Sequence, residues 1–213
     1  MTFYHVGKRL LDIFGSIFCI VIFSPIMILT AIHIKRVSPE GPVLADIPLR
    51  QGKGGKEFRF LKFRSMIPNA HQWLLDHPDI YEKYKCNNFK IGAEEDPRII
   101  PGGVFMRKYS VDELPQFFNV LMGDMSLVGP RAYYPFEVKT QLEKFPDSQK
   151  YMEILKTVKP GITGTWQVSG RSDIDFLERV RMDAEYAQKN SLLYDIWVLL
   201  QTPYVVLTKK GAK

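Results

Sequence analysis

The sequence predicts an α+β protein that is mainly helical, with a small β-hairpin or sheet, and that associates with a membrane through its N-terminal helix. An uncharged apolar run covers residues 13–32, residues 57–63 alternate between polar and apolar side chains, and helical patterns begin at Ser110 and Ser172. The chain has 213 residues, which suits one domain or a domain with an anchor. We therefore expect a membrane helix over residues 1–36 and a folded domain over residues 37–213.

The apolar run from Ile13 to Ile32 is long enough to cross the roughly 30 Å hydrocarbon layer of a bilayer as a helix. Pro25 predicts a kink at its centre, where the Ser24 hydroxyl could satisfy the carbonyl that proline leaves free. Basic residues, which prefer the cytoplasmic side, flank both ends: Lys8, Arg9, Lys35 and Arg36. A re-entrant helix broken at Ser24-Pro25 and a kinked transmembrane helix both remain open at this point.

A second apolar segment covers residues 192–207 and contains Asp195, Gln201 and Pro203. These polar residues and the proline predict one or two short amphipathic helices rather than a second span. The helices would lie in the membrane interface or pack on the core. The aromatic residues of the segment would suit the depth of the lipid headgroups: Tyr194, Trp197 and Tyr204. A buried terminal helix is the alternative.

Several elements are expected in the part between these segments. The alternation over residues 57–63, after a glycine-rich turn, predicts a strand of a hairpin. Residues 67–95 are polar, helical at first and then loop-like. Ser110 to Glu113 has the S-x-x-E pattern of a capping box and predicts a helix start. A helix over residues 136–158 should break at Pro146, and a capped helix should run from Ser172 to about Asn190.

Composition limits the partners. The net charge of +6 and the isoelectric point of about 9.2 favour anionic partners such as phosphates or anionic lipids. The sequence has no nucleic-acid-binding motif, so we do not expect nucleic acid among them. Cys19 lies in an apolar run and Cys86 in a polar one, so a disulfide is not expected, and a reducing, cytoplasmic setting fits.

The adjacent carboxylates Asp112 and Glu113 are the first candidates for chemistry. At a helix start they would lie in positive potential, which stabilises a carboxylate and attracts phosphate. They could act as a nucleophile beside a metal ligand. The alternative is structural, with Glu113 capping Ser110 and Asp112 complementing the helix dipole, and the pattern alone favours it.

Basic residues next to turns or a helix start are the second candidates: Lys62, Arg64, Arg107 and Arg131. Taken singly, each is more typical of a solvated charge. Together with two carboxylates they outline a phosphoryl-transfer site, because cations must neutralise the phosphate oxygens when an anionic nucleophile approaches. Such chemistry usually needs Mg²⁺, for which carboxylates are suitable ligands.

These features resemble the bacterial sugar transferases known as monotopic phosphoglycosyl transferases. The motifs that carry the resemblance span nearly the whole chain: KRLLDIFGS (8–16), SP (24–25), KFRSM (62–66), VDELPQFFNVLMGDMSLVGPR (111–131), KPGITGTWQVSGR (159–171) and DAEY…NS…YDI (183–196). The block at 111–131 is long and specific, and it favours the catalytic interpretation of its acidic pair.

The resemblance implies a monotopic enzyme at the cytoplasmic face of the bacterial inner membrane, with a re-entrant helix at Ser24-Pro25 and membrane lipids as neighbours. Its reaction moves a sugar-1-phosphate from a UDP-sugar to polyprenyl (undecaprenyl) phosphate, releases UMP and initiates surface-glycan assembly. The resemblance makes Asp112 the nucleophile that carries the phospho-sugar and Glu113 the Mg²⁺ ligand.

The same resemblance assigns phosphate binding to Arg107 and Arg131, with assistance from Lys62 and Arg64. Three stretches depart from the family pattern and put substrate contacts in question: residues 47–50, Ala132 after the VGPR turn, and residues 67–95. The sequence does not determine the sugar, and it leaves a monomer and a homodimer open. A non-catalytic scaffold that binds nucleotide or anionic lipid is the alternative functional class.

Overall fold

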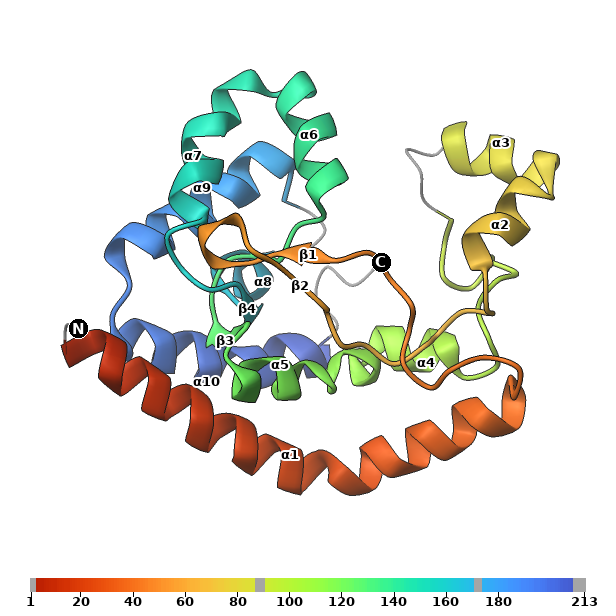
Figure 1. The fold of residues 1–213 in the computed structure, drawn as a ribbon, viewed down its shortest axis with the longest axis horizontal. Helices are drawn as coiled ribbons and strands as arrows, with labels where there is room; N and C mark the ends of the chain where they lie inside the picture. The colour runs from red at the N-terminus through yellow and green to blue at the C-terminus, as the bar shows by residue number, and fades with distance from the viewer. Residues whose placement is uncertain (1–2, 87–90, 171–173, 209–213) are drawn as a thin grey trace.

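The structure is a computed structural model that describes residues 3–86, 91–170 and 174–208. Helices dominate these residues, as predicted, and two small sheets accompany them (Figure 1). The helices are α1 (Phe3–Val37), α2 (Ala70–Leu75), α3 (Pro78–Cys86), α4 (Gly103–Lys108), α5 (Gln116–Met122), α6 (Pro135–Lys144), α7 (Gln149–Leu155), α8 (Thr165–Ser169), α9 (Phe176–Lys189) and α10 (Leu192–Thr208). Short 3₁₀ helices are η1 (Lys53–Gly55), η2 (Val111–Glu113) and η3 (Pro146–Ser148).

The sheets have two strands each. Strands β1 (Arg50–Gln51) and β2 (Glu57–Phe58) form an antiparallel hairpin around the glycine-rich turn, so the predicted strand is present but shorter than residues 57–63. Strands β3 (Ser126–Val128) and β4 (Gly161–Thr163) pair in parallel, with Ser126 opposite Gly161. The parallel pair contacts α1, α5 and α10, and in Figure 1 it lies above α10 and α1 and below the hairpin.

Helix α1 bends between its ends, and the rest of the chain lies on its concave side (Figure 1). Pro25 lies inside the helix, which continues through it. The hydroxyl of Ser24 donates a hydrogen bond of 2.8 Å to the carbonyl of Val21, the group whose helical partner would have been the missing N–H of Pro25. The predicted compensation by Ser24 is therefore confirmed.

The start of α1 is fixed to the rest of the chain by polar contacts. Lys8 Nζ lies 2.8 Å from a carboxylate oxygen of Asp195 in α10, and that carboxylate is fully buried. The guanidinium of Arg9 donates to the carbonyls of Val120 and Leu121 at the end of α5, where a cation also complements the helix dipole. Lys8 and Arg9, the two basic residues that precede the apolar run, therefore also hold α1 against the rest of the protein.

Four helices gather at one side of the fold, along the bottom of Figure 1: α1, α4, α5 and α10. Each of the four helices exposes large apolar or aromatic side chains: Phe14, Phe18, Val21, Ile28 and Leu29 of α1, Phe105 of α4, Phe118 and Met122 of α5, and Leu193, Trp197, Leu200, Tyr204 and Leu207 of α10. In the described ranges, α1 is the one helix that is long and apolar enough to cross a membrane. Contiguous exposed apolar surface of this kind marks a contact with protein or membrane.

Helix α10 is one continuous helix through Pro203 rather than two short ones. Its exposed residues recur at helical spacing, so its outer face is apolar and its inner face packs on the core. Trp197 and Tyr204 are exposed as expected for headgroup depth, whereas Tyr194 is half-buried and packs against the core around Val128 and Tyr186.

The predicted break at Pro146 is confirmed, since α6 ends at Lys144 and α7 begins at Gln149. Ser172 lies outside the described residues. The helix assigned to it begins at Phe176, where the Asp175 carboxylate accepts a hydrogen bond of 2.8 Å from the N–H of Glu178. Asp175 is therefore the N-cap of α9.

The predicted helix start at Ser110 is wrong. Ser110 adopts a left-handed conformation with φ of 56°, and its side chain caps nothing. An N-cap residue normally has an extended backbone that points its oxygen at the next N–H groups, and this conformation does not provide it. A 3₁₀ turn follows, and the regular helix α5 begins only after Pro115.

Candidate active site

The structure brings the acidic pair together with one of the predicted cations. Lys62 Nζ lies 2.9 Å from Oδ2 of Asp112 and 3.5 Å from Oε1 of Glu113. Asp112 is only 1% exposed, whereas the side chain of Glu113 is 40% exposed. One ammonium group thus joins a buried carboxylate to an accessible one.

The backbone around the pair explains this geometry. The N–H of Phe63 donates a hydrogen bond of 2.8 Å to the carbonyl of Asp112, so residue 62 runs beside η2. Asp112 lies in the first turn of the short 3₁₀ helix η2, and the regular helix α5 starts only at Gln116. The cation paired with Asp112 is Lys62.

Asn119 holds the segment that presents Lys62. This asparagine of α5 is fully buried, accepts a hydrogen bond of 2.9 Å from the N–H of Leu61 and donates one of 2.8 Å to the carbonyl of Arg59. These two hydrogen bonds take the place of the backbone hydrogen bonds that a longer strand would make along this segment. The sequence analysis missed Asn119, although a buried amide within the apolar pattern QFFNVLM was a usable signal.

Arg107 approaches the pair from α4. Its Nε donates a hydrogen bond of 3.0 Å to the hydroxyl of Ser65, which leaves the terminal guanidinium nitrogens available to an anion. Burial lowers the pKa of Arg107, and the charge of Asp112 opposes this shift. The predicted cation is therefore close enough to act on the candidate nucleophile.

Arg64 has different surroundings. It is buried, and its guanidinium donates to the carbonyl of Pro42, to the hydroxyl and carbonyl of Ser38, and to the carbonyl of Met66. These bonds use its Nε and both terminal nitrogens to hold the loop after α1. The phosphate role suggested for Arg64 by resemblance remains a prediction, and these contacts do not support it.

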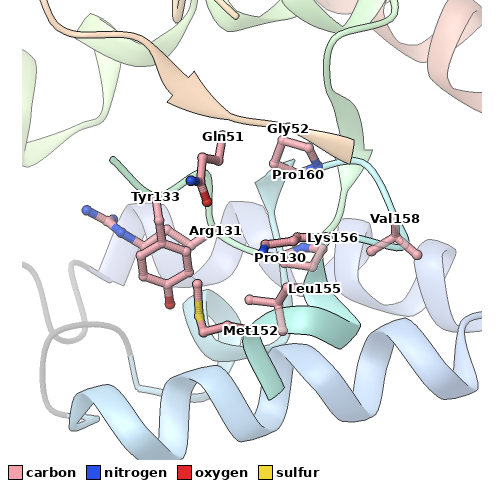
Figure 2. Close-up of a pocket in the computed structure, with 10 residues that line it drawn as sticks. All are labelled: Gln51, Gly52, Pro130, Arg131, Tyr133, Met152, Leu155, Lys156, Val158 and Pro160. Atoms are coloured by element: carbon pink, nitrogen blue, oxygen red, sulfur yellow. The ribbon is translucent and has the colours of Figure 1, made fainter. Parts of the chain in front are cut away.

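Arg131 lies in the turn that leads from β3 to α6. Its N–H donates a hydrogen bond of 3.0 Å to the buried carboxylate of Asp183, and its guanidinium lies beside the rings of Tyr133 and Trp166. Figure 2 shows the Arg131 side chain passing Tyr133, with its guanidinium directed away from Met152. Among the described residues, Arg131 makes no ion pair with Asp112 or Glu113.

Arg50 lies beside the same turn. Its guanidinium lies 3.3 Å from the ring centroid of Tyr134 and donates to the carbonyl of Ala132. Burial lowers the pKa of Arg50 and the charge of Arg131 lowers it further, while Tyr134, Glu137 and Glu113 oppose the shift. Its nearest carboxylate is that of Glu137, 4.0 Å from Nη1. The sequence analysis noted residues 47–50 only as a departure, so this cation was not predicted.

Three buried carboxyl groups among the described residues have raised pKa values, those of Asp12, Asp112 and Asp183. Burial, helped by the charge of Glu113, raises the pKa of Asp112, while Lys62 and Arg107 oppose the shift. Burial raises the pKa of Asp183 to about 7, against the hydrogen bond from Arg131. Burial alone would lower the pKa of Lys62, but the charges of Glu113 and Asp112 outweigh it and raise that pKa.

The oxygen ligands present fit Mg²⁺ bound jointly with substrate. The described residues contain no cluster of three or more histidine, cysteine or acidic side chains that would hold a metal by itself. Oδ1 of Asp112 has no hydrogen-bond partner there, and Glu113 is accessible. Mg²⁺ is commonly held by one or two carboxylates together with substrate phosphates and water.

Comparison with known proteins found a matching family and several similar proteins. The family model described as bacterial sugar transferase matches residues 3–209. The chain is 43% identical to the undecaprenyl-phosphate galactose phosphotransferase of Salmonella typhimurium over 96% of its length, which is 41% of that protein. It is 36% identical to the UDP-N-acetylgalactosamine-undecaprenyl-phosphate N-acetylgalactosaminephosphotransferase of Aeromonas hydrophila over 99% of its length, 46% of that protein.

A shorter relative matches along most of its own length. The exopolysaccharide production protein ExoY of Rhizobium meliloti is 33% identical over 97% of this chain and 88% of that protein. The chain therefore spans less than half the length of the Salmonella and Aeromonas relatives and most of the length of the Rhizobium one.

Proposed function

The chain belongs to the bacterial sugar transferase family, and on that premise we propose that it transfers a sugar-1-phosphate from a UDP-sugar to undecaprenyl phosphate. The names of the Salmonella and Aeromonas relatives support the donor and acceptor classes. The observation that carries the proposal is the Lys62 ammonium shared between a buried Asp112 and an accessible Glu113. A purely structural surface pair would not need the carboxylate of Asp112 to be removed from water.

In the first step, an oxygen of Asp112 attacks the sugar-bearing phosphorus of the UDP-sugar. The bond between that phosphorus and the bridging oxygen breaks, UMP leaves with the electron pair, and an acyl phosphate remains on Asp112. In the second step, a phosphate oxygen of undecaprenyl phosphate attacks the same phosphorus and releases the carboxylate. An acyl phosphate is reactive enough to pass its group on, which makes the two-step route feasible.

The residues of this chain have separable roles in that route. Lys62 keeps Asp112 ionised in the free enzyme and moves with the transferred phosphoryl group when Asp112 reacts. Arg107 neutralises phosphate oxygens, and Arg131 and Arg50 are placed to meet the more distant part of the nucleotide sugar. Glu113 would hold Mg²⁺, which supplies additional positive charge to the phosphates when bound. Fixed cations of this kind stabilise the transition state without reorganising.

The apolar side of the fold completes the proposal. We infer that α1 is re-entrant and that α4, α5 and α10 lie in the interface at the cytoplasmic face of the inner membrane, because the four helices lie along one side of the fold (Figure 1) and each leaves apolar side chains exposed. The site then receives UDP-sugar from water and the polyprenyl phosphate from lipid. The product initiates a surface glycan, in keeping with the name of the Rhizobium relative.

The decisive experiment measures UMP release by the purified protein with Mg²⁺ and a panel of UDP-sugars, before any lipid acceptor is added. The two-step route predicts a burst of UMP of up to one equivalent per enzyme and a phospho-sugar adduct on Asp112. The variant Asp112→Asn should give neither, while Asp76→Asn, an exposed aspartate on a distant loop, should behave as wild type. UMP that forms only when acceptor is present would contradict the covalent intermediate.

A further inference from the structure

A second basic cavity lies away from the acidic pair. It has a volume of about 330 Å³ and lies between the first turns of α1, the β1–β2 turn, the loop before β4 and the end of α9. In Figure 1 these elements meet near the N-terminal end of α1, whereas α4 and α5 flank the acidic pair farther along that helix. None of Lys62, Arg107, Asp112 and Glu113 lines this cavity, so the proposed reaction does not account for it.

Four basic side chains line the cavity: Lys8, Arg9, Lys53 and Lys159. The acidic residue among the lining residues is Asp12, whose carboxylate already accepts hydrogen bonds from the hydroxyl of Ser126 and the N–H of Leu127. The charge of Lys8 is paired with Asp195. The remaining cations therefore carry charge that no carboxylate in direct contact neutralises.

Lys159 and Arg9, which both line the cavity, come together beside Gly123 at the end of α5. A Cβ atom built on Gly123 would lie 3.4 Å from Nζ of Lys159 and 3.6 Å from Nη2 of Arg9. Arg9 is held there by two carbonyls, and half-buried Lys159 makes no hydrogen bond or ion pair with the described residues. Burial lowers the pKa of Lys159, the charges of Arg9 and Lys53 lower it further, and the charges of Asp12 and Asp124 oppose the shift.

An ammonium group that is partly removed from water and lies near two other cations is stabilised by a bound anion. Lysine supplies a point charge and arginine a planar donor fork, and both suit phosphate oxygens. We propose that this cavity is a second anion site that binds a phosphate group through Lys159, Arg9 and Lys53. The phosphate could belong to a lipid headgroup or to a soluble phosphate compound, since both present the same oxygens.

The position of the cavity makes the lipid source testable. The α1 turns that line it also expose Phe3, Val6 and Leu10. Helical spacing puts these side chains on the face of α1 opposite the cavity, so a lipid headgroup would reach the cavity around the N-terminal end of α1. This lipid version, unlike the anion site itself, depends on the proposed placement of α1 in the membrane. A site of this kind would link membrane composition to the docking of α1 on β3.

Titration calorimetry on the purified full chain in neutral detergent tests the site with three probes: dihexanoyl phosphatidylglycerol, dihexanoyl phosphatidylcholine and inorganic phosphate. The variant is Lys53→Gln with Lys159→Gln. The control is Lys56→Gln, which changes an exposed lysine of the same turn that does not line the cavity. Comparing the variant with wild type separates this cavity from any phosphate bound near Asp112.

We expect wild type and the control to bind phosphatidylglycerol equally, and the double variant to bind about 30-fold more weakly, as for the loss of two interfacial lysines. A matching loss for inorganic phosphate would assign the site to soluble phosphates, and a loss for phosphatidylglycerol alone would assign it to lipid. Equal affinity of wild type and double variant for both probes would overturn the proposal, as would an absence of binding to wild type.

UMP release provides the check on folding and on the proposed reaction, because neither Lys53 nor Lys159 belongs to the proposed catalytic site. The double variant should release UMP at the wild-type rate in detergent. If it fails to fold, the single variant Lys53→Gln, which changes an exposed side chain, should still weaken binding about fivefold. If the wild-type protein released no UMP, this result would count against the proposed transferase function but not against the anion site.

Discussion

The ammonium group of Lys62 lies 2.9 Å from a carboxylate oxygen of Asp112, a side chain that is almost completely buried. A carboxylate in this position is ionised at neutral pH only to the extent that nearby cations offset the cost of burial. Lys62 therefore controls the protonation state of the candidate nucleophile and covers it until substrate arrives.

Replacing Lys62 with methionine removes the cation but keeps much of the side-chain volume. The pKa of Asp112 should rise further, because burial and Glu113 both raise it and Lys62 opposes them. UMP release should fall by about 10²–10³-fold, the usual effect of losing one charge-stabilising group. The acidic limb of the pH–rate profile should also move to higher pH. An unchanged limb would show that Lys62 does not act through Asp112.

Asp112→Asn should stabilise the folded protein while it abolishes transfer. The folded-state pKa of Asp112 is raised, so its contribution to stability is greatest below the unfolded-state pKa and is lost as pH rises through the folded-state value. At pH 7 the neutral amide should therefore raise the unfolding temperature, by roughly 2–4 °C if the gain is about 1 kcal/mol. Thermal unfolding at pH 7 and pH 4 should show that the gain shrinks at the lower pH.

Asn119→Ala should disturb the site without touching the reacting groups. It removes two hydrogen bonds and leaves the N–H of Leu61 and the carbonyl of Arg59 without their partner, at a cost of about 2–3 kcal/mol. Denaturant unfolding should report that loss. The rate of UMP release should fall because Lys62 follows these residues directly. Gln188→Ala, at an exposed position of α9, is the control and should change neither measurement.

Ser24 and Pro25 should be coupled. Ser24→Ala leaves the Val21 carbonyl without the hydroxyl that it accepts from, whereas Pro25→Ala restores a backbone donor to the same carbonyl. The double variant should therefore form a straighter helix than wild type and favour a membrane span. Cysteines introduced before Lys8 and after Lys35 should be labelled from the same side in wild type and from opposite sides in the double variant. Labelling of wild type from opposite sides would exclude a re-entrant α1.

The sequence by itself determined the family, the mainly helical fold, the apolar helix with a compensated proline and the acidic pair as the candidate for chemistry. These features rest on local chemistry or on contiguous motifs. Pro25 removes a donor wherever it occurs in a helix, and the block at residues 111–131 is read directly from the chain. The break at Pro146 followed from the same local rule.

Only the tertiary structure decided which charges serve the site. Arg64 and Lys62 are two residues apart in the sequence. The guanidinium of Arg64 donates hydrogen bonds to Ser38 and Pro42, whereas the ammonium group of Lys62 pairs with Asp112. Lys62 lies fifty residues earlier in the chain than Asp112, and the backbone hydrogen bond from Phe63 to Asp112 brings the two segments together. Burial and pairing are set by contacts between distant segments, and a linear pattern of charges does not contain them.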